Sequence, residues 1–575
     1  MFRRALFFLL TSLILTFQTQ AESVQSIDDL RGLVGEVGPV MGSAMACKTI
    51  PRSNVDKVIN EFWKVLQQSV SQNDRAELSD LFTRSLADGR AAIKSGKTNC
   101  EATQQRFTAM EQSISGPERS ADPAHPASTV PPAAPAAATA APAAPTAAPA
   151  APTAAPAAPT AAPAAATAAP AAATAAPAVP TAAPAVPTTA AAVPTAAHAA
   201  PSVHGITENE IKFGMVAPFT GMSKDIGRML EIGITSAFNR ANDEGGIHGR
   251  KLRLIVADDG YEPTRTVAAV KQLYENKNVF AFIGNYGTPT GAAALPYLID
   301  HRILLFNPFT GAAVFRRIPP DRYVFNFRAS YDDEMDAVVR YLLKVRHLQP
   351  KQIAVFAQDD SYGDAGYGGV AKAFRALGLS DAAIPRWPYK RNTVDVDQAV
   401  NSLKLNRKVT KAVIMVASYR AAAKFIEQTR DLYPGMIYTN TSFTGSNQLS
   451  NELMLLGPRF APGVIVTQVL PNVSGNSTEV LEYKDVLSKY FPNEAAADYV
   501  SFEGYIAANI LIEALKRVGP QVNTEKLIST LEDMRDIDVG IGTSLNFSRA
   551  DHQASHNVWG TQIDEKGNYQ YLELK

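Results

Sequence analysis

Cysteine is rare in this chain, and neither sign of charge is in surplus. The 575 residues include 2 Cys, and the 55 basic side chains are matched by 55 acidic ones. Two cysteines are too few for a disulfide-dense scaffold or for a zinc cluster built from cysteine. Without a surplus of Lys and Arg, a nucleic-acid partner is not expected, nor is a polybasic contact with a membrane.

Apolar runs long enough to cross a membrane are missing as well. Near the start, two arginines precede an apolar run over Ala5–Phe17 and a small-x-small site that ends at Ala21. This order predicts a secretory signal peptide over residues 1–21. An uncleaved membrane anchor is the alternative, although the run is shorter than the roughly 20 residues that a span needs. We therefore expect a soluble protein that is exported to the periplasm.

The two cysteines, Cys47 and Cys100, lie in a segment with helical periodicity. Because thiols are oxidised in an exported protein, we expect them to form a disulfide, with two unpaired buried thiols as the alternative. The apolar residues at helical spacing are Val55, Ile59, Phe62, Trp63, Leu66, Leu78, Leu81, Phe82 and Leu86. The sequence therefore predicts a small helical domain over residues 22–115, in which no pattern indicates catalysis.

Residues 116–203 consist almost entirely of alanine, proline and threonine, and a seven-residue unit repeats there from Ala141. A period of seven suggests a coiled coil, but proline recurs in nearly every unit and removes the helical hydrogen-bond donors. The segment is therefore predicted to be an extended, disordered linker. It is either a plain spacer or a tether that crosses an envelope layer.

From His204 to the C-terminus, short apolar segments alternate with amphipathic ones. The strands expected from this pattern are 211–217, 252–258, 279–284, 303–307, 353–357, 412–417 and 436–439. Strands separated by helices predict parallel sheets covered on both faces. The pattern restarts after Tyr331, which predicts two doubly wound lobes with a ligand site beyond the carboxyl ends of their strands.

Six motifs of this region occur in an order known from one family of solute receptors. They read NDEGGIHGRKLRLIVADDGYEPTRT, GNYGTPTG, NPFTGA, FRASYDDE, QDDSYGDAG and FEGYIAANILIEAL. From Gly205 onward, the chain therefore resembles the leucine/isoleucine/valine-binding periplasmic proteins of ABC transporters. The resemblance implies an α/β type I periplasmic binding fold, two lobes joined by a hinge. The expected lobes are residues 205–328 with 473–540 and residues 329–472 with 541–575.

Two loops of lobe one are candidates for holding the anionic end of a solute. The first contains Tyr286, Gly287 and Thr288, and the second contains Thr310 and Gly311. Hydroxyl and backbone N–H groups near a helix start favour a carboxylate. The resemblance implies that these loops grip the ligand's α-carboxylate. For the two threonines, plain helix capping is the alternative.

Lobe two offers aromatic candidates. Tyr362 and Tyr419 match positions where the family places rings around the solute, with lobe packing as the alternative. After the strand that ends near Thr439, amino-acid receptors of the family place a carboxylate that holds the ammonium group. This chain has Ser442 and Phe443 in that segment and no acid. The departure favours a small aromatic or aliphatic acid without an ammonium group.

Patterns for catalysis or metal binding are weak. His552 and His556 are four residues apart beside Asp551, but the segment reads as a loop and lacks the glutamate of a zinc-hydrolase helix. No nucleophile elbow or P-loop occurs. Asp258 and Asp259 end a strand, yet paired carboxylates alone do not specify acid–base chemistry. We therefore expect no enzymatic activity, no metal and no cofactor.

The expected function is capture of a small amino acid-like or carboxylate solute between two lobes, for delivery to a membrane ABC permease. The alternative is an envelope-tethered sensor or scaffold that uses the same fold without transport. The helical domain and the linker motivate this alternative, because an ordinary receptor needs neither. In that case the helical domain would bind an envelope partner.

Overall fold

The structure is a computed structural model, and part of the chain is described in it. The described residues are 27–70, 72–115, 203–381, 384–494 and 497–575. The predicted signal peptide lies outside these residues, and so does the predicted linker apart from Val203. Among the described residues, no helix combines the length and the apolar character that a membrane crossing requires.

Four helices form the described part of the N-terminal region. They are α2 (Ile27–Ala46), α3 (Arg52–Ser69), α4 (Gln72–Lys94) and α5 (Cys100–Ser115). Their apolar faces meet in a core where the rings of Phe62, Trp63 and Phe82 pack on one another. The helical periodicity of the sequence therefore predicted this region correctly.

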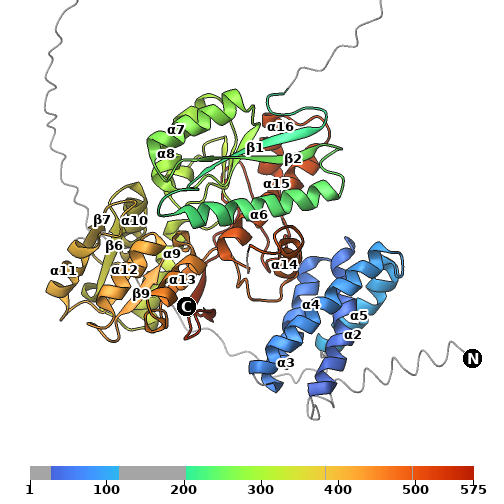
Figure 1. The fold of residues 1–575 in the computed structure, drawn as a ribbon, viewed down its shortest axis with the longest axis horizontal. Helices are drawn as coiled ribbons and strands as arrows, with labels where there is room; N and C mark the ends of the chain where they lie inside the picture. Colours follow the sequence, from blue (N-terminus) through green and yellow to red (C-terminus); the bar gives the residue numbers. More distant parts are fainter. Residues whose placement is uncertain (1–26, 71, 116–202, 382–383, 495–496) are drawn as a thin grey trace, which may run out of the picture. The chain divides into compact units, whose positions relative to one another are not determined.

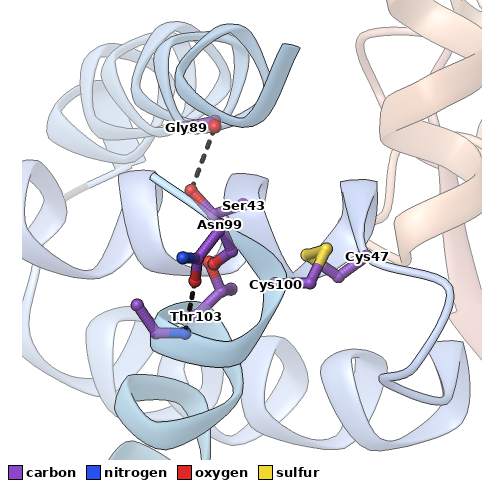
Figure 2. Close-up of a disulfide and its surroundings, with 7 residues drawn as sticks. Ser43, Cys47, Gly89, Asn99, Cys100 and Thr103 are labelled. Atoms are coloured by element: carbon purple, nitrogen blue, oxygen red, sulfur yellow. Dashed lines mark hydrogen bonds between the residues drawn. A yellow bond between two sulfur atoms is a disulfide. The ribbon is translucent and has the colours of Figure 1, made fainter. Parts of the chain in front are cut away.

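A disulfide ties the last helix of this region to the first. Cys47 directly follows α2, Cys100 begins α5, and their sulfur atoms are bonded, which confirms the predicted pair (Figure 2). Nearby, the Ser43 hydroxyl of α2 donates a hydrogen bond of 3.0 Å to the Gly89 carbonyl of α4 (Figure 2). The side-chain oxygen of Asn99 accepts from the Ala102 N–H at 2.8 Å, at the start of α5.

The first of two sheets is all parallel and defines lobe one. Its strands are β1 (Glu210–Ala217), β2 (Lys251–Asp258), β3 (Ala281–Ile283), β4 (Leu305–Phe306) and β5 (Val324–Phe325), in the order β2-β1-β3-β4-β5. Its helices are α6 (Lys224–Asp243), α7 (Pro263–Lys271), α8 (Thr288–Asp300), α14 (Thr478–Tyr490), α15 (Tyr499–Val518) and α16 (Thr524–Asp533). In Figure 1, the red helices α15 and α16 lie with the green elements of this lobe, so the chain returns to lobe one late in the sequence.

The second sheet defines lobe two. Its strands are β6 (Ile353–Gln358), β7 (Arg386–Tyr389), β8 (Ala412–Val416), β9 (Ile437–Asn440), β10 (Ile465–Gln468), β11 (Trp559–Ile563) and β12 (Tyr569–Leu572), in the order β12-β11-β10-β9-β8-β6-β7. The pairs of β11 are antiparallel and the others are parallel. Its helices are α9 (Tyr331–Arg340), α10 (Ser361–Ala376), α11 (Asp397–Asn406), α12 (Tyr419–Thr429) and α13 (Ser446–Leu456). Every residue of β6 and β8 is buried, as expected for strands covered on both faces.

The chain passes between the lobes at three places. It leaves β5 for α9 and later leaves β10 for α14. The third passage comes after residue 554, because His552 and Ala554 hydrogen-bond to Asn326 beside β5, whereas β11 belongs to lobe two. This passage therefore lies later in the chain than residue 540, where the lobe-one segment was expected to end. In both sheets the first strand lies between the next two, and in open α/β sheets ligands bind at such a point, beyond the carboxyl ends of the strands.

Candidate functional site

Aromatic rings from the loops of both lobes meet between the two sheets. Phe443, in the turn after β9, has its ring centroid 6.4, 4.8 and 5.7 Å from the rings of Tyr261, Tyr286 and Phe309. These three residues follow β2, β3 and β4 of lobe one. On lobe two, the ring of Tyr362 lies 4.4 Å from that of Phe443. We define the aromatic cluster as Tyr261, Tyr286, Phe309, Tyr331, Tyr362 and Phe443, all of them buried.

The two candidate threonines of lobe one contact each other at the edge of this cluster. The hydroxyl oxygens of Thr288 and Thr310 are 2.6 Å apart, and the Thr310 hydroxyl lies 3.4 Å from that of Tyr331. The backbone N–H groups of Tyr286 and Gly287 donate to carbonyls of lobe one. The backbone N–H groups of Tyr286 and Gly287 are therefore engaged within lobe one, and the two threonine hydroxyls are engaged with each other.

The two candidate glycines make room for tyrosine rings. A Cβ atom on Gly287 would lie 2.4 Å from a ring carbon of Tyr261, and the residue has φ +99°. A Cβ atom on Gly311 would lie 2.5 Å from a ring carbon of Tyr331. Glycine at both positions therefore lets the backbone of the two loops approach the aromatic cluster closely.

Tyr362 and Tyr419 lie at the starts of two lobe-two helices but have different partners. The Tyr362 hydroxyl is 2.8 Å from the Thr441 hydroxyl, and its ring belongs to the aromatic cluster. The Tyr419 hydroxyl donates to the carboxylate of Asp225 on α6 at 2.6 Å, which connects the lobes. Burial is the largest cause that raises the pKa of both tyrosines, so both hydroxyls are neutral.

Ser442 and Phe443 belong to a short 3-10 turn, Ser442–Thr444, that a buried carboxylate holds in place. The Ser442 N–H and hydroxyl donate to Glu334 at 2.8 and 3.0 Å. The Thr467 hydroxyl of β10 donates to the same carboxylate, and the Arg328 guanidinium donates to the Ser442 hydroxyl. The position of the Phe443 ring is therefore fixed by hydrogen bonds within lobe two and at its junction with lobe one.

Arg328 forms a fully buried ion cluster at the first passage between the lobes. Its guanidinium lies 3.2 Å from Glu503 on α15 of lobe one and 3.6 Å from Glu334 on α9 of lobe two. Burial opposes its charge, but the two carboxylates more than offset burial and raise the pKa of Arg328. Burial raises the pKa of Glu334 and Glu503, and Arg328 opposes that change. The cluster links both lobes to the turn that carries Phe443.

Further hydrogen bonds connect the lobes around the aromatic cluster. The Gln358 amide of lobe two donates to the Tyr261 hydroxyl at 3.1 Å. Arg391 and Asn392, also of lobe two, donate to the carboxylate of Glu262 at 3.2 and 2.7 Å. These contacts join the loop that follows β2 to the end of β6 and to the loop that follows β7, so the described conformation is closed.

A small cavity lies beside the cluster, with Phe309, Ser442 and Glu503 in its wall. It has a volume of about 10 Å³, which is about the room for one water molecule. This cavity is therefore smaller than an amino acid.

The carboxylate and histidine pairs considered in the sequence have structural partners. Asp258 accepts hydrogen bonds from Phe219 and Thr220 in a turn of lobe one. The His552 ring stacks on Phe325, and His556 pairs with carboxylates of the protein. Within the described ranges, no group of His, Cys, Asp and Glu side chains has a metal-binding arrangement.

Comparison with known proteins identifies the family. The model of the periplasmic binding protein family matches residues 210–568, which is more than half of the chain and includes nearly all of both sheets. The chain belongs to this family. Its predicted type I fold and its predicted resemblance to leucine/isoleucine/valine-binding proteins are confirmed.

Individual members of the family are similar over the same region. A structure described as a possible leucine/isoleucine/valine-binding protein from Rhodopirellula baltica SH 1 is 33% identical, with a TM-score of 0.60, and the match covers 65% of this chain and 99% of that one. A substrate-binding periplasmic protein from Ralstonia solanacearum is 27% identical, with a TM-score of 0.57 and coverages of 63% and 100%. The Leu/Ile/Val-binding protein BraC3 of Rhizobium johnstonii is 23% identical over 345 residues, with coverages of 58% and 86%.

Several residues of the site in this periplasmic binding domain were not predicted from the sequence. Tyr261 and Phe309 belong to the aromatic cluster. Arg328 and Glu334 hydrogen-bond to Ser442, next to Phe443. Arg328 could have been noticed as a charged residue after the apolar segment VFNF. The other three have no local signal, because their position in the site depends on which loops meet across the cleft. The ligand-binding roles of the candidate residues stay predictions.

Proposed function

We propose that this chain is exported to the periplasm, binds a small carboxylate or amino acid-like solute between its lobes and delivers it to a membrane ABC permease. The observation that carries the proposal is the aromatic cluster, which loops of both lobes form in a member of the periplasmic binding protein family. A solute that contacts both lobes stabilises the closed form, whereas one that contacts a single lobe does not. The protein therefore acts by binding rather than by catalysis.

The chemistry of the cluster supports an acid without an ammonium group. Thr288 and Thr310 supply hydroxyls on the lobe-one side, and Tyr362 and Thr441 supply them on the lobe-two side. The nearby carboxylate of Glu334 already accepts hydrogen bonds from the lobe-two turn and from β10. A buried ammonium would need a free carboxylate partner, whereas an aromatic or aliphatic acid needs donors and apolar rings.

Thermal unfolding of the full chain in the presence of candidate solutes tests this proposal. The panel contains amino acids, amides, aliphatic acids and aromatic acids, each at a concentration of several millimolar. A solute at a hundred times its dissociation constant stabilises by about 2.7 kcal/mol, which raises the melting temperature measurably. A rise with acids that lack an amine is the expected result. A rise with leucine or valine alone would contradict the proposed solute class, and no rise across the panel would contradict the receptor function.

The alternative function is an envelope-tethered sensor or scaffold, and one observation favours it. The disulfide-linked helices α2–α5 lie outside residues 210–568, the part that the family model matches. Cell fractionation of the full chain and of a variant without residues 22–115 separates the two functions. Release of both proteins by osmotic shock is expected for the transport receptor. Retention of the full chain with the envelope, and release of the variant, is expected for the scaffold.

A further inference from the structure

We propose that Phe443 is a built-in occupant of the solute site: its ring fills the aromatic socket of lobe one, so the lobes close without solute. The socket is defined here as Tyr261, Tyr286 and Phe309. The inference rests on the proposed function in one respect, because it takes this socket to be the place where a solute binds.

The socket is built from one ring on each of three successive loops of lobe one. Tyr286 stacks on Phe443 with 25° between the ring planes and a centroid distance of 4.8 Å. Tyr261 packs edge-on against Tyr286 at 5.0 Å, and Phe309 stacks on Tyr286 at 5.9 Å. Stacked and edge-on aromatic pairs at these distances are favourable beyond the apolar area they bury. The socket therefore suits a planar ring, and Phe443, which is 0% exposed, supplies one.

Phe443 enters the socket from the opposite lobe as part of a rigid element. Both residues next to it in the chain are held: Ser442 by Glu334, and Thr444 by the Asn440 amide, which donates to the Thr444 hydroxyl at 3.0 Å. Gly445 follows with φ +80°, which ends the turn. The turn that carries the ring is therefore held to lobe two, and the ring leaves the socket when lobe two swings away.

This arrangement changes the usual relation between solute and closure. In a two-lobed receptor the solute supplies the contacts that make the closed form the stable one. Here the ring of lobe two already supplies contacts to the socket of lobe one. A solute with an aromatic ring must compete with Phe443 for the same space. An aromatic carboxylate can stack on Tyr286 and reach the hydroxyls of Thr288 and Thr310 once the lobes separate.

Distance measurement between two spin labels tests the inference on the full chain. The labels are attached at Lys277→Cys in lobe one and Leu405→Cys in lobe two, because both positions are exposed. The native cysteines are bonded to each other, so the label reacts with the introduced thiols alone. Without solute, the otherwise unchanged chain is expected to give a single short distance. Phe443→Ala is expected to increase the population at longer distances at least tenfold.

Benzoate serves as the probe ligand. In Phe443→Ala it is expected to restore the short distance, because its ring replaces the missing side chain. In the chain that keeps Phe443, it is expected to bind at least tenfold more weakly. Equal binding in both chains would overturn the competition between the solute and this ring.

Two further variants separate the proposal from a general loss of packing. Phe425→Ala removes an equally buried ring that stacks on Phe356 at 4.6 Å within lobe two, and it is expected to leave the label distance short. Phe443→Leu keeps most of the apolar volume in case the alanine variant does not fold, and it is expected to give an intermediate open population.

Long distances in the chain that keeps Phe443 would overturn the inference, as would distances that Phe443→Ala leaves unchanged. Neither result depends on whether a solute of the panel stabilises the protein. The receptor function and the role of Phe443 can therefore fail separately.

Discussion

The hydroxyls of Thr288 and Thr310 hydrogen-bond to each other at the lobe-one edge of the aromatic cluster. Replacement of both by valine keeps their shape and removes the hydroxyls. We expect at least a tenfold loss of affinity for a carboxylate solute, because hydrogen bonds to a charged group contribute roughly 1.5 to 3 kcal/mol each. Calorimetric titration of the double variant checks this. Unchanged affinity would show that these hydroxyls do not hold the anion.

The ion pair between Asp333, at the start of α9, and His556 makes the free energy of unfolding depend on pH in two directions. Burial opposes ionisation of Asp333, but hydrogen bonds from His556 and Ser330 more than offset it and lower the pKa of Asp333 to about 2. Asp333 and then Asp551 raise the pKa of His556 to about 10. The contribution of Asp333 to the free energy of unfolding is therefore present above pH 4 and is lost as the pH falls through about 2. The contribution of His556 to the free energy of unfolding is present below pH 6 and is lost as the pH rises through about 10.

Asp333→Asn tests this pair. The variant should lower the pKa of His556 toward its ordinary value and reduce the free energy of unfolding at neutral pH by about 1 kcal/mol, since the His556 side chain is 60% exposed and screened by water. Nuclear magnetic resonance titration of His556 and urea unfolding measure the two effects. His556 titrating near its ordinary pKa in the unchanged protein would contradict the pairing.

At the scale of secondary-structure elements, the Cys47–Cys100 bond joins α2 to α5 across a separation of 53 residues. Replacement of both cysteines by serine should lower the free energy of unfolding of the helical region by about 4 kcal/mol, because the unfolded chain is no longer closed into a loop. Calorimetry should show a lower melting temperature for this region and little change for the periplasmic binding domain. The reduced native protein is the control and should behave like the double variant. No change in either protein would contradict a stabilising role.

The same region shows how far local pattern predicts an element. Helical spacing in the sequence indicated helices around Phe62 and Phe82, and α3 and α4 contain them. In lobe two, the expected strand at 353–357 differs from β6 by one residue. Strands β7, β10, β11 and β12 of this lobe were missed. Of these, β7 contains Pro388, and β10 has polar Thr467 and Gln468. These short strands form because neighbouring strands offer partners, which local pattern does not report.

At the scale of the whole molecule, Arg328 connects the lobes through buried carboxylates. Arg328→Met should lower the free energy of unfolding by about 3 to 5 kcal/mol, because it leaves Glu334 and Glu503 buried without a counter-charge. Urea unfolding measures this. Arg459→Met is the control, because both side chains of the Arg459–Asp431 pair are more than half exposed. This variant should lower the free energy of unfolding by less than about 1 kcal/mol. Equal losses in both variants would contradict the role of the buried cluster.

The sequence by itself determined the class of the molecule. Apolar segments separated by helices require a parallel sheet with two covered faces, and two cysteines allow only one disulfide pairing within the chain. The tertiary structure decided the site. Tyr261, Phe309 and Phe443 lie far apart in the chain and meet because strand order brings their loops to one cleft and closure brings the lobes together. Local periodicity shows which face of an element is buried, whereas the partners of a loop depend on long-range packing.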